Sequence, residues 1–222
     1  MNDPSDWVPE ERRPLLVAYA EEIMVWNTKV NLISRTSLDE LDNRHIKHCL
    51  ALAWRRFPEH ARVVDWGTGG GLPAVPLAIA FPTVSFVAVD SIAKKTAALR
   101  CIVRDLGLDN VEVWQGRAEA WEGTSSYFVS RATAPLRHLW KWSKRAMIAP
   151  VEGSSPPSGL QEQNDSDGRA IWEPGLICLK GGDLAKEIRQ LKGKAHVSQW
   201  RLEEIAPILR LEEKHVLHVA PS

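Results

Sequence analysis

The stretch VVDWGTGGGLP, residues 63–73, joins a short β-branched run to a turn that holds four glycines within five residues. Glycine adopts backbone conformations closed to other residues and lets other groups approach the main chain closely. A strand, a glycine-rich turn and a helix in succession form the unit with which open parallel sheets bind nucleotide-like ligands. This stretch therefore predicts an α/β fold with a binding site at the end of its first strand.

The chain beyond this turn alternates between short apolar runs and amphipathic stretches. Parallel strands are expected at RVVDW, TVSFVAVD, NVEVWQG, YFVSRA and GLICLKGG, and two antiparallel strands at HVSQWRLEEI and EKHVLHVAP. Helices are expected at LPAVPLAIAF, at AKKTAALRCIVRDLG and over residues 135–147. This alternation predicts a doubly wound, Rossmann-like sheet.

The segment before the first strand has apolar residues at helical spacing. Residues 15–30 form one candidate helix and residues 37–57 a second, for which Ser37 and Glu40 supply a capping box. We expect residues 1–60 to form a helical cap and residues 61–222 the sheet domain, together making one compact unit. Residues 151–175 are rich in Ser, Pro, Gly, Asn and Asp, and predict a mobile surface loop.

Composition narrows the classes of protein that this chain can belong to. Its 28 basic and 28 acidic residues cancel, so only a local basic face could recognise nucleic acid. No apolar run is long enough to span a membrane, and the acidic N-terminus does not resemble a signal peptide. The three cysteines form no C-x-x-C pair, and no third ligand accompanies His45 and His48. We therefore expect a cytoplasmic protein with no metal site.

The spacing of the glycines fits two classes of cofactor. Gly69, Gly71 and Ala74 match the G-x-G-x-x-G/A fingerprint of dinucleotide-binding proteins. Asp65, Gly67, Gly69 and Gly71 match D-x-G-x-G-x-G, which resembles the first motif of S-adenosylmethionine (SAM) methyltransferases. In that motif the glycines let the backbone lie against the amino acid and ribose portions of SAM.

Acidic residues follow the next two strands. Asp90 ends SFVAVD, where a carboxylate can hydrogen-bond ribose hydroxyls; the alternative is that it caps the following helix. Glu119 lies in GRAEAW after the third strand and is the candidate to meet adenine, the alternative being an ordinary solvated acid.

Several stretches taken in order resemble the ribosomal RNA small subunit methyltransferase G family, also called RsmG or glucose-inhibited division protein B. They are WN…NLIS, RHI, DWGTGGGLPAVPLAIAFP, VDSIAKKTAALR, LGLDNVEVWQGRAE, SRATAPL and CLKG. The resemblance implies a class I SAM methyltransferase fold with extra N-terminal helices. It also implies methylation of guanine N7 in the 530 loop of 16S rRNA, with SAM as cofactor and S-adenosylhomocysteine as product. The partner would be the small ribosomal subunit, and the protein is expected to be a monomer.

The resemblance, carried over position by position, also implies the residues of the site. The cofactor-binding residues would be Gly67, Gly69, Gly71, Leu72, Asp90, Ala118, Glu119 and Arg131, and those tied to catalysis or RNA would be Asn31, Arg117 and Arg131. Guanine N7 has a free lone pair, so the enzyme must orient the base rather than remove a proton. Arg131 is expected to position guanine O6, the SAM carboxylate or a phosphate, the alternative being a structural ion pair.

The chain departs from the family pattern in four places. Trp66 stands where valine is usual, residues 47–49 read Lys-His-Cys instead of Leu-Asp-Ser, Lys214 replaces arginine, and residues 151–175 are longer than the usual turn. These departures bear on RNA docking more than on SAM binding.

Two segments could supply a basic face for RNA. Residues 137–145 carry four basic residues and no acid, and residues 180–194 carry five basic residues and two acids. Each could equally be a solvated helix face; together they predict a rim that follows phosphates. The ten tryptophans are expected mostly in the core, with one of Trp140 and Trp142 buried, rather than as exposed rings that stack on bases.

Three other functions remain open from the residues alone. The chain could methylate another RNA or a small molecule with SAM. It could be an NAD-dependent oxidoreductase that uses the Gly69, Gly71, Ala74 frame, although no nicotinamide-side catalytic pair is evident. It could also be a weakened SAM- or RNA-binding relative, which the departures at Lys214 and residues 47–49 would favour.

Overall fold

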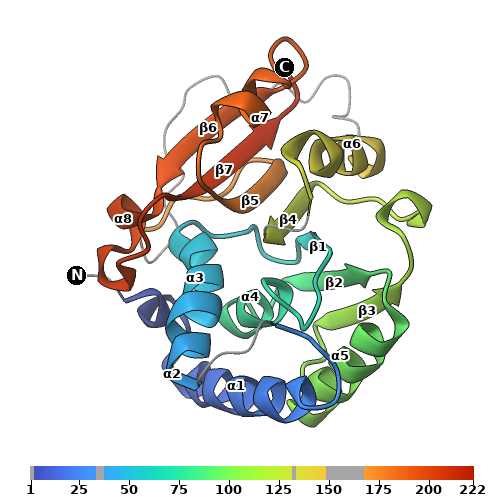
Figure 1. Cartoon of the computed structure of the whole chain (residues 1–222), viewed down its shortest axis with the longest axis vertical. Coiled ribbons are helices and arrows are strands. Elements are labelled where there is room, and N and C mark those ends of the chain that lie inside the picture. The colour runs from blue at the N-terminus through green and yellow to red at the C-terminus, as the bar shows by residue number, and fades with distance from the viewer. Residues whose placement is uncertain (1–2, 34–37, 132–133, 149–167) are drawn as a thin grey trace.

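The computed structural model describes residues 3–33, 38–131, 134–148 and 168–222, and its centre is a mixed sheet of seven strands (Figure 1). The strands are β1 (Arg62–Trp66), β2 (Ser85–Asp90), β3 (Val111–Gln115), β4 (Tyr127–Arg131), β5 (Gly175–Gly181), β6 (His196–Arg201) and β7 (Lys214–Ala220). They lie in the order β3-β2-β1-β4-β5-β7-β6. Strands β1 to β5 pair in parallel, and β7 runs antiparallel between β5 and β6. The chain therefore winds outward in both directions from β1, as the expected doubly wound fold requires.

Helices cover both faces of this sheet. They are α1 (Arg13–Asn27), α2 (Leu38–Leu41), α3 (Lys47–Leu50), α4 (Ala74–Ala80), α5 (Ala93–Asp105), α6 (Leu136–Ala146), α7 (Ala185–Arg189) and α8 (Leu202–Ile205). Side chains alternate along β4, so Val129 packs with α1, α3, α4 and α5, whereas Phe128 packs with α6 on the other face. No helix within the described residues is long and apolar enough to cross a membrane.

The segment expected to be one helix over residues 37–57 is broken into four pieces. Helix α2 is followed by a π turn (η3, Asp42–Ile46), then by α3 and by a 3-10 turn (η4, Ala51–Trp54). Ser37, the expected cap, lies outside the described residues. The Lys47 ammonium bonds Asp3 at 3.0 Å and Asp42 at 3.3 Å, so the first departure in residues 47–49 joins the N-terminal segment to η3. π turns are common at functional sites, and this one contains the RHI motif.

Part of the expected mobile loop is a packed segment. Residues 151–167 lie outside the described residues, but Trp172 is buried and its indole N–H donates to the Leu52 carbonyl at 3.0 Å. The rings of Trp54, Trp172 and Trp200 meet edge to face with centroids 5.3–5.9 Å apart. Including residues 168–174 in a mobile loop was therefore wrong, because Ile171 bridges Arg56 and Trp172 contacts Leu52 of η4 and Trp200 of β6.

The two C-terminal strands are confirmed, with one correction. Strand β6 ends at Arg201, and residues expected to continue it form α8. All ten tryptophans lie in described residues, and each is buried or half-buried. Trp140 is buried and Trp142 half-buried, as expected. The tryptophans therefore serve mainly to pack the protein.

Trp66, the departure within the glycine motif, is accommodated by a serine on α6. Its ring is fully buried and stacks on Phe128 with centroids 5.8 Å apart and planes 8° apart. Its Nε1–H donates to the Ser143 hydroxyl at 3.0 Å, and that hydroxyl donates to the Leu139 carbonyl at 2.9 Å. The larger ring therefore gains both a stacking partner and an acceptor in the α6 layer.

We expect Ser143→Ala to lower the free energy of unfolding by about 1–3 kcal/mol, because it leaves the Trp66 N–H buried without an acceptor. Trp66→Val should cost about 3 kcal/mol or more through the cavity it opens. Urea unfolding measures both. The double variant Trp66→Phe with Ser143→Ala should lose less stability than the Trp66→Phe and Ser143→Ala single variants lose in sum, because phenylalanine has no N–H that needs an acceptor. A Ser143→Ala protein as stable as the unchanged chain would contradict this role.

Candidate active site

The residues expected at the site lie at one edge of the sheet, where the parallel strands end. Residues 67–72 follow β1, Asp90 ends β2, a 3-10 turn (η5, Ala118–Ala120) follows β3, and Arg131 ends β4. Because β1 lies between β2 and β4, these strand ends are neighbours (Figure 1). In doubly wound sheets this edge, at the point where the strand order reverses, is where ligands bind.

Asp90 fastens the glycine turn to β2. The Gly69 N–H donates to Asp90 Oδ2 at 2.9 Å, and the Ile92 N–H donates to Asp90 Oδ1 at 2.8 Å. The N–H groups of Gly67 and Thr68 both donate to the Val89 carbonyl, at 2.9 and 3.0 Å. The carboxylate therefore shapes the turn and also holds the start of the next helical segment. Each oxygen retains a lone pair for a further donor.

The glycines of the turn are required for different reasons. At Gly69 (φ 58°) an added Cβ would meet only the Leu32 carbonyl, at 3.7 Å. At Gly71 (φ 103°) it would lie 2.6 Å from a Val75 methyl and 2.8 Å from a Leu99 methyl. Close packing against the protein's own core therefore requires glycine at position 71, whereas Gly69 leaves its side of the turn open. A cofactor contact at Gly71 stays a prediction.

Helix α1 positions the connector that passes over this turn. The Asn27 Oδ1 accepts from the N–H groups of Leu32 and Ile33, at 2.8 and 3.0 Å. The buried Tyr19 hydroxyl donates to the Gly70 carbonyl at 2.9 Å. Sequence reasoning missed both residues, although an asparagine at the last position of a helix was a visible sign of a structural cap. Asn31 is exposed on the same connector, and its catalytic role stays a prediction.

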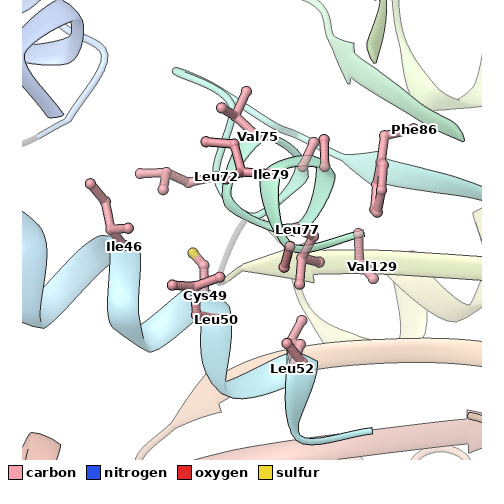
Figure 2. Packing of buried hydrophobic residues seen from close by; sticks show 14 of the residues in the cluster. Ile46, Cys49, Leu50, Leu52, Leu72, Val75, Leu77, Ile79, Phe86 and Val129 are labelled. Carbon is pink, nitrogen blue, oxygen red and sulfur yellow. The ribbon is translucent and has the colours of Figure 1, made fainter. Parts of the chain in front are cut away.

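Leu72 points into the core rather than outward. Its side chain is 4% exposed, and Figure 2 shows it near Ile46 of η3 and Ile79 of α4. Any cofactor contact at this position would therefore use the Leu72 backbone.

Asp65 lies fully buried at the base of the site. Burial raises the pKa of its carboxyl to about 7, against the lowering effects of the nearby Thr68 hydroxyl, the Ala74 N–H and the charge of Arg131. The Ala74 N–H donates to Asp65 Oδ2 at 3.1 Å. Asp65 thus holds the first turn of α4 against β1.

Arg131 is held by a neutral histidine from the N-terminal segment. Arg131 Nη1 and His45 Nδ1 are 2.9 Å apart. Burial first, and then the charges of Arg131 and Arg44, lower the pKa of His45 to about 4. Since a guanidinium can only donate, His45 Nδ1 accepts from Arg131 at neutral pH. Burial raises the pKa of the nearby Cys49 thiol to about 12, so this cysteine is not a nucleophile.

His48 is buried beside the same cation. Burial lowers its pKa to about 3, and the charges of Arg131 and Lys214 act in the same direction. Its Nε2 has no hydrogen-bond partner among the described residues. His48, one departure from the family pattern, therefore lies close enough to feel the charges of both Arg131 and Lys214, a second departure.

His48 should make the protein less stable as the pH falls. The unfolded chain takes up a proton near pH 6.5, whereas the folded His48 stays neutral until about pH 3. Below pH 6.5 the unfolded state therefore binds more protons, and His48 alone should remove about 2–3 kcal/mol of the free energy of unfolding by pH 4.5. Urea unfolding of His48→Asn at pH 7 and pH 4.5 measures this. The variant should lose less stability than the unchanged chain, and an equal loss would contradict the assignment.

Helix α6 holds the turn after β3 with two side chains. The Trp142 indole N–H donates to Glu119 Oε1 at 3.0 Å. Arg145 donates to the carbonyls of Ala118 and Trp121, at 3.0 and 2.7 Å. Glu119 is exposed but oriented by Trp142, which the sequence did not indicate. Arg117, in the same segment, is exposed, and its role stays a prediction.

Comparison with solved structures finds the same fold in other proteins, a methylase among them. The ribosomal protein L11 methylase of Lactobacillus delbrueckii subsp. bulgaricus has a TM-score of 0.56 and 14% identity, over 81% of this chain and 79% of that one. A chain of a fibrillarin/Nop5p complex has a TM-score of 0.53 and 11% identity, over 78% and 79%. At these identities the likeness concerns the fold alone, and it confirms the expected Rossmann-like methyltransferase architecture.

Comparison of sequences is more specific. The family model for rRNA small subunit methyltransferase G matches residues 12–152. Ribosomal RNA small subunit methyltransferase G of Salinibacter ruber is 48% identical over 82% of this chain and 78% of its own length. The proteins of that name from Bacteroides fragilis (strain ATCC 25285) and Chlorobaculum tepidum are 38% and 37% identical, over 83% and 91% of this chain and 82% and 87% of theirs. The match to the family model and the identity with these relatives show that the chain belongs to the rRNA small subunit methyltransferase G family.

Proposed function

We propose that this chain uses SAM to methylate N7 of a guanine in the 530 loop of 16S rRNA. Family membership supports ribosomal RNA of the small subunit as the substrate. The structural observation that carries the proposal is the hydrogen bond from the Gly69 N–H to the Asp90 carboxylate, at the same edge of the sheet as the end of β4, where Arg131 lies. It puts an ordered carboxylate, an open stretch of backbone and a cation at one edge of the sheet.

The residues present fit SAM better than a dinucleotide. A pyrophosphate would need free N–H groups at the start of α4. The Ala74 N–H is bonded to Asp65 at 3.1 Å and the Val75 N–H to the Gly71 carbonyl at 2.7 Å, while Pro73 and Pro76 have none. This helix terminus therefore has no donor left for phosphate, which disfavours the oxidoreductase.

Each residue would contribute binding or orientation to the reaction. SAM, when bound, supplies a methyl group on a positively charged sulfur that leaves as a thioether. Asp90 would accept from ribose hydroxyls, and Gly67 and Gly69 would let the amino acid portion lie on the turn. Arg131 would hold the guanine by donating to O6 while the N7 lone pair forms the new bond to carbon. Methyl transfer to N7 requires no general base to remove a proton. This fits a site in which the buried Cys49 and His48 are neutral.

The direct test supplies methyl-labelled SAM and small ribosomal subunits that lack the modification, and then maps the labelled base. Label at N7 of one guanine in the 530 loop is the expected result. SAM binding without label on the subunit, measured in the same preparation, would move the function to another RNA, a small molecule or an inactive relative. Free 16S rRNA assayed in parallel determines whether the substrate is the RNA or the assembled particle. We also propose a cytoplasmic monomer.

A further inference from the structure

The exposed side chains of α6 and α7 form a basic face on a chain of zero formal net charge. We call it the α6–α7 basic face; its exposed members are Arg137, Lys141 and Lys144 of α6, Lys186 and Arg189 of α7, and Lys192 and Lys194 in the turn after α7. Arg137, Lys141 and Lys144 recur at helical spacing, so they follow one stripe of α6. The two helices contact each other (Figure 1). None of the seven makes an ion pair within the described residues.

The acid that would neutralise this face is turned inward. Glu187 Oε2 accepts from Lys180 Nζ at 2.9 Å and from the Leu136 N–H at 2.6 Å. Burial raises the pKa of Glu187, but the hydrogen bonds from Lys180 and Leu136 outweigh it, so the pKa is lowered and the carboxylate stays charged. Glu187 therefore balances the buried Lys180 and joins α7 to the start of α6. Glu187 is therefore not available to pair with the exposed cations.

The structure also changes which cations are available from the two segments. Lys180 is 8% exposed and is committed to Glu187 and to the Ala134 carbonyl. Arg145 is bonded to two carbonyls of the turn after β3. The margins carry two exposed acids: Asp183 accepts from the Ala185 N–H, and Glu119 from the Trp142 indole N–H. What remains is a surface over α6 and α7 on which cations outnumber acids, in place of a rim at the ends of the strands.

The location of the face suits a long polyanion that also reaches the candidate active site. Helix α6 begins five residues after Arg131, at the carboxyl edge of the sheet, and its length of about 16 Å leads away from that edge. A surface hollow of about 480 Å³ is lined by Lys186, Arg189 and Gln190 of the α7 segment. A strand whose base lies at Arg131 can therefore continue over α6 and α7.

We propose that the α6–α7 basic face docks the phosphate backbone of the rRNA next to the target guanine. This inference rests on the proposed function for its substrate. Phosphate contacts of this kind supply affinity and register but no base specificity. Each one should add about 0.7–0.9 to the slope of log affinity against log salt.

Two pairs of substitutions test the face against a matched control. Lys141→Gln with Lys144→Gln alters α6, and Lys186→Gln with Arg189→Gln alters α7. Arg100→Gln with Arg104→Gln removes two exposed cations from α5, on the opposite face of the sheet. Binding of a 16S rRNA transcript is measured from 50 to 300 mM KCl, together with KM and kcat on small subunits that lack the modification.

Each test pair should lower the salt slope by about 1.4–1.8 and weaken RNA binding about 10–100-fold at low salt. KM for subunits should rise while kcat and SAM affinity stay within about twofold, which separates docking from misfolding. The α5 pair should leave binding and slope unchanged. If the unsubstituted protein labels the guanine, but the α6 and α7 variants bind RNA with the same affinity and salt slope as the α5 variant, the docking proposal alone is overturned. If the variants change RNA binding and its salt dependence as expected, but the unsubstituted protein places no label on the guanine, the proposed reaction alone is overturned.

Discussion

Arg131→Ala should reduce methyl transfer to the small subunit by about 10²–10³-fold, to or near the limit of detection. A positioned donor at the reacting group is worth about that much when it is removed. Arg131 lies at the end of β4, half-buried, with its guanidinium held 2.9 Å from His45 Nδ1. Arg131→Lys should recover little, because an ammonium on a flexible stem cannot reproduce a planar fork. Rates at saturating SAM and subunits measure the effect.

His45 should act through Arg131, and this makes the role of the arginine testable. His45→Ala removes the acceptor and should slow transfer about 10–100-fold. His45→Asn keeps an acceptor oxygen near the position of Nδ1 and should restore most of the rate. If the two residues act as a unit, Arg131→Ala with His45→Ala should be no slower than Arg131→Ala alone.

A control histidine separates positioning from general stability. His218 is buried on β7, which β5 separates from the strand of Arg131, and its Nε2 lies 3.1 Å from the Glu173 carbonyl. His218→Asn should lower stability without changing the effect of Arg131→Ala. Multiplicative effects of His45→Ala and Arg131→Ala, or equal loss in His45→Asn and His45→Ala, would show that His45 does not position the arginine.

Gly71→Ala should destabilise the protein by about 3–5 kcal/mol and greatly weaken SAM binding. A methyl group would lie 2.6 Å from Val75 and 2.8 Å from Leu99, and the residue would have to keep a φ of 103°. Overpacking costs about 1–3 kcal/mol and a backbone strained in this way about as much again. Because Val75 and Leu99 are fully buried, we expect the turn to move in response, which would displace the Gly69 N–H from Asp90. Urea unfolding and SAM titration measure the two effects.

Gly107→Ala is the matched control for this prediction. Gly107 also has a positive φ, of 63°, but an added Cβ there would meet no atom within 4 Å. It should cost only the backbone strain, about 1–2 kcal/mol, and leave SAM affinity unchanged. Equal losses at positions 71 and 107 would mean that strain alone, and not packing under the turn, requires glycine at position 71.

The order of elements and the edge that carries the site could be predicted because both follow from local pattern. Alternating apolar runs and amphipathic stretches define a parallel sheet, and the carboxyl ends of its strands meet at one edge. Asp90 and Arg131 were therefore predicted in strands that they do end, whereas their roles in the site stay predictions. The break of the N-terminal helix at η3 and the packed end of the long loop were not readable, because both depend on partners distant in the chain.

By itself, the sequence determined the fold class, the family and which strand ends carry chemistry-bearing residues. Only the tertiary structure decided what those residues touch. His45 meets Arg131 across 86 positions, and Glu187 turns inward to Lys180 and leaves α7 basic. The physical reason is that side-chain periodicity specifies which face a residue occupies, whereas burial and hydrogen bonding depend on the element packed against that face. For the same reason one glycine of the turn is required by the core and another stays open to a ligand.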